Sequence, residues 1–132
     1  MTNAIGIALS GLQAAAKRVN AVASNIANLQ TVGSLTPGGQ APYTPLEVQQ
    51  TAQANGGVAS DYAPRNPAFV PAYDADSPFA DENGVIGVPN VDLATEAVNL
   101  NLAELTYKAN LKTIEAARDL DKELLSIFDR KV

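Results

Sequence analysis

The stretch AIGIALSGLQAAAKRVNAVASNIANLQT, residues 4–31, decides the fold. Its apolar side chains recur every seven residues in two columns: Ile5, Leu12, Val19 and Ile26 in one, and Ala8, Ala15, Val22 and Leu29 in the other. Such a repeat is typical of a helix that lies against another helix. We predict a helix that begins near Asn3 and ends between Asn28 and Gly33, and this helix needs a partner.

The partner helix is predicted at the other end of the chain, over residues 91–132. No Gly or Pro interrupts this segment. Its apolar positions follow an eleven-residue repeat, which drifts little along a straight helix: Val98, Leu102, Leu105, Ala109, Thr113, Ala116, Leu120, Leu124 and Ile127. A second column lies on another face: Leu93, Leu100, Tyr107, Leu111 and Ile114. Because this helix is longer than the first and has two apolar faces, part of it is expected to pack against another subunit.

Residues 32–90 have a different character. They hold all eight prolines and seven of the nine glycines, so no long helix fits. Short extended segments fit at Tyr43–Gln50, Phe69–Tyr73 and Val85–Val88. We predict a tight turn at Asn83-Gly84 between the last two.

The block Ala52–Gly57 is predicted to be a mobile loop tip, because it is small and polar. Asn90 is the expected cap of the second helix. Asp92 and Glu96 are expected to interact favourably with the positive end of the helix dipole. The sequence therefore predicts a mainly α fold, whose long N- and C-terminal helices pair as a coiled coil around a small β/loop excursion. Its three parts are an N-terminal helix over residues 1–31, a Pro/Gly-rich segment over residues 32–90 and a C-terminal helix over residues 91–132.

Composition excludes several classes of function. The net charge is −5, and no basic patch with interleaved aromatics suggests a nucleic-acid partner. The chain has no cysteine and no histidine, which excludes disulfides, the usual zinc ligands and Ser-His catalysis. No segment reaches the ~20 apolar residues of a transmembrane helix. The N-terminus lacks a secretory signal pattern, so we expect a protein that stays in the cell or leaves without a cleaved signal.

The remaining motifs that could carry chemistry are interpreted as ordinary structural features. Ser10, Ser24 and Lys17 lie on a packing helix, which argues against a Ser-Lys catalytic pair. The acidic run from Asp74 to Asn83 contains Pro78 and departs from the spacing of a calcium-binding loop, so a solvated loop is preferred. Gly38-Gly39-Gln40, a tripeptide also used by peptide-release factors, is interpreted as a flexible turn. We therefore predict no enzyme activity, no cofactor, no metal site and no small-molecule substrate.

Two stretches together resemble a known family. Residues 18–31, RVNAVASNIANLQT, resemble the N-terminal ASN-(I/L)-AN-x-x-T signature of bacterial flagellar rod, hook and hook-associated proteins. Residues 73–92, with PNVD at 89–92, EAVNL at 96–100 and LTYKAN at 105–110, are similar to the pattern of proximal rod proteins of the FlgC type. The chain departs from that pattern at Val85, Ala97 and Thr106.

The resemblance implies a structural subunit of the flagellar basal-body rod that transmits torque. Proteins of this kind pair their terminal helices, stack the pairs into a tube, and are exported through the flagellar type III apparatus without a cleaved signal. The implied partners are further copies, other rod subunits, and membrane-ring and rod-base proteins. The implied location is the periplasm-spanning rod. The alternatives are another axial component of the flagellum, or a coiled-coil adaptor that binds one partner and builds no filament.

The expected assembly interface combines both helices. Its members are Ile5, Leu12, Val19, Asn25, Ile26, Asn28, Leu29, Val98, Leu102, Leu105, Tyr107, Asn110, Leu120 and Leu124. Asn25 and Asn28 are predicted to fix the register between subunits, since buried amides do so at some cost in stability. The alternative for these two residues is that they cap and terminate the helix.

Overall fold

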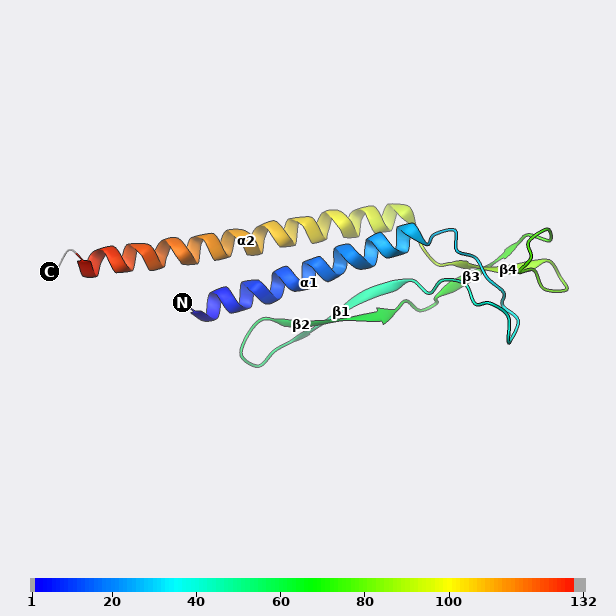
Figure 1. Cartoon of the computed structure of the whole chain (residues 1–132), viewed down its shortest axis with the longest axis horizontal. Coiled ribbons are helices and arrows are strands. Elements are labelled where there is room, and N and C mark those ends of the chain that lie inside the picture. Colours follow the sequence, from blue (N-terminus) through cyan, green and yellow to red (C-terminus); the bar gives the residue numbers. More distant parts are fainter. Residues whose placement is uncertain (1, 130–132) are drawn as a thin grey trace.

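The computed structural model describes residues 2–129. The elements follow the order α1 (Thr2–Ala27), β1 (Leu46–Ala52), β2 (Val58–Pro64), β3 (Phe69–Tyr73), β4 (Val85–Pro89) and α2 (Leu93–Asp129). The molecule is elongated, with α1 and α2 antiparallel, the β1–β2 hairpin beside α1, and β3–β4 at one end (Figure 1). The two terminal helices and the small β region between them are confirmed. No helix within the described range is long and apolar enough to cross a bilayer.

Helix α1 lies between α2 and the hairpin, so two of its faces are covered. Ala8, Ala15 and Val22, which form one predicted column, are buried. The other predicted column is only half-buried, and its last member, Ile26, is 41% exposed. The buried residues Ala14 and Ala21 lie outside both columns and face the hairpin.

The hairpin is held to α1 by polar contacts. Ser10 Oγ accepts a hydrogen bond of 3.0 Å from the backbone N–H of Val58, and Lys17 Nζ donates to the carbonyl of Ser60. The hairpin tip also touches α1, because a Cβ on Gly57, whose φ is +83°, would meet Ser10 Oγ at 2.5 Å. The tip predicted to be mobile is therefore docked on the helix.

Helix α2 turns small and polar residues toward α1. The covered positions recur every seven residues: Glu96, Ala103, Asn110 and Ala117. At Gly11 the backbones approach so closely that an added Cβ would meet Asn110 Oδ1 at 2.5 Å. Most of the large apolar residues of α2 are instead exposed, although Ile114 is half-buried. The eleven-residue repeat is therefore not the surface that α1 covers, which corrects the expectation that helix one would take part of it.

Two cross-helix contacts fix the register of the pair. Gly11 lies against Asn110, and Asn25 lies against Glu96. Fourteen residues separate the two contacts on each helix, which is two heptads. Nine further residues bring α1 to its first residue, Thr2, and α2 to Asp119. The last ten residues of α2, about 15 Å of helix, therefore extend beyond the start of α1 (Figure 1).

The strands differ from the prediction in four places. Strand β1 begins at Leu46 instead of Tyr43, because the Tyr43 N–H bonds the carbonyl of Thr31, and it ends at Ala52 instead of Gln50. Strand β2, which pairs antiparallel with β1 from Leu46↔Pro64 to Ala52↔Val58, was not predicted. Its sequence VASDYAP has a single β-branched residue and contains Ala, Asp and Pro, which are depleted in strands, so it does not stand out as a strand. Strand β3 agrees with the prediction, and β4 extends one residue further, to Pro89.

The connection between β3 and β4 is a loop over residues 74–84, and the predicted tight turn lies at its end, where the Gly84 N–H bonds the carbonyl of Asp81 at 3.0 Å. Asp81 organises its end, because its carboxylate accepts hydrogen bonds of 2.8 Å from the N–H groups of Asn83 and Val85. The bond from Val85 lowers the pKa of Asp81 below its usual range. Gly84 closes the loop with a φ of +75°, a conformation that suits glycine.

The predicted cap of α2 is wrong by two residues. Asp92, not Asn90, caps the helix, because its Oδ2 accepts from the N–H of Thr95 at 2.9 Å and from its hydroxyl at 2.6 Å. The side-chain bond from Thr95 lowers the pKa of Asp92. Asn90 instead donates its amide to the carbonyl of Pro67. The predicted end of the helix at Val132 lies outside the described residues.

We expect Ala103→Leu to separate the helices. Ala103 is fully buried where α2 meets α1, and overpacking a close contact costs about 1–3 kcal/mol. Urea unfolding of the purified chain, followed by circular dichroism at the helix band, should show a lower midpoint. Ala97→Leu, on the exposed side of α2, is the matched control. Equal midpoints for Ala103→Leu and the parent chain would contradict the close-packing account.

Candidate functional site: a polar junction and an outward leucine face

Asn25 is the centre of a buried polar cluster, which we call the polar junction. Its side chain is fully buried. Its Nδ2 donates to the carbonyl of Leu46 at 2.8 Å, and its Oδ1 accepts from the Leu46 N–H at 2.8 Å. The side-chain amide of Asn25 therefore forms both a donor and an acceptor hydrogen bond with the backbone of Leu46, the first residue of β1, as the backbone of a neighbouring strand would. Tyr43 adds a hydroxyl that donates to Asn25 Oδ1 at 3.1 Å.

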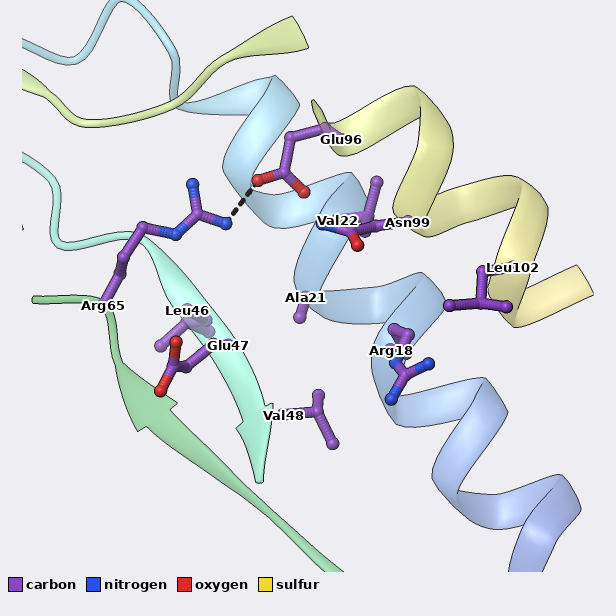
Figure 2. Close-up of a pocket in the computed structure, with 10 residues that line it drawn as sticks. All are labelled: Arg18, Ala21, Val22, Leu46, Glu47, Val48, Arg65, Glu96, Asn99 and Leu102. Carbon is purple, nitrogen blue, oxygen red and sulfur yellow. Dashed lines mark hydrogen bonds and ion pairs between the residues drawn. The ribbon is translucent and has the colours of Figure 1, made fainter. Parts of the chain in front are cut away.

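Glu96 and Arg65 complete the polar junction. Arg65 Nη2 and Glu96 Oε1 form an ion pair of 2.5 Å (Figure 2), and Asn25 Nδ2 reaches the same oxygen at 3.3 Å. Arg65 also donates through Nη1 to the carbonyl of Asn90 at 2.9 Å. The Glu96 side chain is fully buried, and the Arg65 side chain is 20% exposed. The junction thus ties α1, α2, the start of β1 and the end of β2 together.

The polar residues at the end of α1 each have a local partner. Ser24 Oγ lies 2.9 Å from the Tyr43 hydroxyl. Asn28 donates its amide to the carbonyl of Ser24 at 2.9 Å, and Thr31 Oγ1 donates to Asn28 Oδ1 at 3.2 Å. Asn28 therefore bonds the Ser24 carbonyl through its side chain as well as through its backbone N–H, which donates to the same oxygen at 3.1 Å. Asn25 makes its hydrogen bonds within the subunit, and the role in the register between subunits that the sequence suggested for Asn25 and Asn28 stays a prediction.

A groove of about 310 Å³ lies beside the polar junction, between α1, β1 and α2. We call it the junction groove. Figure 2 shows Val48 on β1 and Leu102 on α2 at its walls, with Arg18 on α1 beneath. Glu96 Oε2 has no hydrogen-bond partner within residues 2–129, and Glu96 lines this groove. Arg18 takes part in no ion pair within the same range.

The outward side of α2 carries what we call the leucine face. Its members share one side of the helix and are all at least 45% exposed: Val98, Leu102, Leu105, Leu120, Leu124 and Ile127. Burying one such side chain contributes about 1.5–3 kcal/mol. A face of this size along one helix indicates a surface that other protein covers.

A second apolar groove, of about 480 Å³, lies between α1 and α2. Val19 lines it from α1, and Leu100 and Tyr107 line it from α2. Among the described residues, no group of three or more acidic side chains is placed to hold a metal ion.

The predicted interface residues fall into three groups. Asn25 and Asn110 make their contacts inside the chain, against β1 and Gly11. Five are half-buried: Ile5, Leu12, Val19, Asn28 and Leu29. Seven are exposed: Ile26, Val98, Leu102, Leu105, Tyr107, Leu120 and Leu124. The structure therefore gathers most of the predicted α2 residues on open surfaces and places the two central amides behind them.

Arg65 was not predicted from the sequence, and Glu96 was assigned only a dipole role. One signal was available, because Arg65 is the only basic residue between Arg18 and Lys108. A lone cation in an acidic segment suggests a buried partner. The pairing itself, over 31 residues of sequence, has no local pattern.

Two family models match the ends of the chain. The model described as flagella basal body rod protein matches residues 5–33, and that described as flagellar basal body rod FlgEFG protein C-terminal matches residues 82–127. These matches cover α1 and nearly all of α2, the helices that carry the junction and the leucine face. They define the class as flagellar basal-body rod proteins.

Whole-chain comparisons narrow the class. The chain is 35% identical to flagellar basal-body rod protein FlgC of Salmonella typhimurium over 96% of its length and 97% of that protein. It is 34% identical to the FlgC protein of Yersinia enterocolitica, over the same shares. It is 35% identical to that of Agrobacterium fabrum, over 86% and 85% of the two chains. The chain belongs to the FlgC family of flagellar basal-body rod proteins. None of these descriptions denotes an enzyme.

We expect Arg65→Met to destabilise the fold strongly. It leaves the buried Glu96 carboxylate without its cation, and breaking a buried pair in this way costs about 3–5 kcal/mol. Urea unfolding measures the loss. The double variant Arg65→Met, Glu96→Leu should recover much of it, because no buried charge remains. Lys112→Met, which breaks an exposed pair with Glu115, is the control and should leave the midpoint unchanged. A single variant as stable as the parent would refute the role of the junction.

Proposed function

We propose that this chain is a structural subunit of the proximal rod of the bacterial flagellar basal body, and that it has no catalytic role. The observation that carries this proposal is that different sides of α2 have different residues and different surroundings. Small and polar residues bind α1, while the leucine face stays exposed at Val98, Leu102 and Leu105 and again at Leu120, Leu124 and Ile127. A chain that functioned alone would gain by burying these residues inside.

Assembly supplies the missing partners. Each subunit buries its leucine face against neighbouring rod subunits, and the apolar contact contributes on the order of 5–10 kcal/mol before the costs of association. In the rod we propose that α1 and α2 act as a coiled coil, forming the axial parts at residues 1–31 and 91–132. Residues 32–90 form the outer part. The tied helix ends at the polar junction give the subunit the rigidity that torque transmission needs.

The finer biology follows from the family resemblance. We propose that the chain passes through the flagellar type III export apparatus without a cleaved signal and joins the periplasm-spanning rod. Its partners there are itself, other rod subunits, and membrane-ring and rod-base proteins. Fractionation tests this directly: the chain should purify with detergent-resistant basal bodies. A coiled-coil adaptor would appear in the soluble fraction instead.

We expect Leu105→Asp or Ile26→Asp to stop assembly. Both side chains are exposed, at 64% and 41%, so the new charge spares the subunit and acts on its neighbours. Swimming in soft agar and recovery of basal bodies measure the effect. Ala97→Asp adds the same charge at an exposed position of α2 outside the leucine face and should be neutral. Full motility of the Leu105→Asp strain would refute packing through this face.

A further inference from the structure

The last ten residues of α2 have no partner helix within residues 2–129. They extend past Thr2, the first described residue of α1 (Figure 1). Yet Leu120, Leu124 and Ile127 continue the leucine face along this extension, at 56%, 45% and 59% exposure. A helix end that carries such a stripe over open solvent requires a docking surface elsewhere.

The junction groove offers a surface of matching shape and chemistry. Leu46 and Val48 of β1 form one apolar wall, and Leu102 of α2 forms the other. Its floor holds Arg18, which has no carboxylate partner within residues 2–129. The groove therefore suits an apolar helix stripe that is flanked by an acidic side chain.

The extension carries such a flank. Glu123 lies one residue from Leu124 and one turn from Leu120 and Ile127, at the border of the leucine face. It forms no ion pair within the described residues. Its charge is opposite to that of Arg18, while Arg65, the other cation of the groove, is already paired with Glu96.

We infer that the extension of α2, residues 120–127, docks in the junction groove of a second copy of this chain. Leu120 and Leu124 enter between Val48 and Leu102, and Glu123 pairs with Arg18. Groove and extension are different surfaces of one molecule, so the contact is heterologous and builds an open helix instead of a closed dimer. Twenty-two residues separate Leu102 from Leu124, which sets an offset of about 33 Å between copies of the same polarity. This inference rests on the proposed function and specifies one of its contacts.

Cysteine crosslinking tests the contact, because the chain has no cysteine of its own. Basal bodies are isolated from cells whose only copies are Val48→Cys and Leu124→Cys chains, expressed together, and are treated with a short bis-maleimide. We expect a product with twice the mass of the chain. Tyr73→Cys with Leu124→Cys is the matched control, since Tyr73 is 77% exposed on β3, far from the groove, and should give no product.

A charge swap tests the ion pair in the same particles. Arg18→Glu should reduce the 48–124 product about tenfold, because it sets two carboxylates against each other. Arg18→Glu combined with Glu123→Arg should restore it.

Basal bodies that contain the chain but yield no 48–124 product would overturn the docking, and so would equal products from the control pair. If the thiol introduced by Val48→Cys is protected from maleimide without that product, the groove belongs to a different rod subunit and the docking of a second copy is wrong. Absence of the chain from basal bodies would instead refute the proposed function.

Discussion

The close approach of α1 and α2 is the constraint on which the rest of this structure depends. The two backbones come together over Gly11, Ala15 and Ala103, where no large side chain would fit. An interface of small residues leaves no room for the leucines that α2 carries, so they must lie on its other sides. The narrow contact inside the subunit and the wide apolar surface outside it therefore both follow from the packing of α1 against the small residues of α2.

The polar junction compensates for what this narrow contact lacks. Small residues bury little apolar area, and the pair of helices would slide if nothing else held it. Asn25 gives the register a specific hydrogen-bonding partner, and the ion pair between Arg65 and Glu96 joins the β segment to both helices. A buried charge without its partner costs free energy of folding. We therefore expect the hydrogen bonds and the ion pair of the polar junction to form together or not at all. This coupling ties the ends of both helices to the β segment.

Inside the subunit, polar contacts hold the elements together, while large apolar residues lie on its surface. The junction groove between β1 and α2 combines both kinds of residue, since it is lined by apolar side chains and by charged ones. Membership of the FlgC family fits a molecule whose most apolar surface is the one it shows to others. The acidic loop between β3 and β4 lies at the opposite end of the molecule from the extension of α2 (Figure 1).

The sequence by itself determined the two long helices, the Pro/Gly-rich segment between them, the strands β3 and β4, and the family. It could do so because periodicity, proline content and short motifs are local properties of the chain. It also marked the leucine face, since a stripe is visible whether or not its partner is present. Tertiary structure alone decided that α1 covers the small residues of α2, that VASDYAP forms β2, and that Arg65 pairs with Glu96. Each of these depends on which distant segments meet, and burial and pairing energies decide that only once the chain is folded.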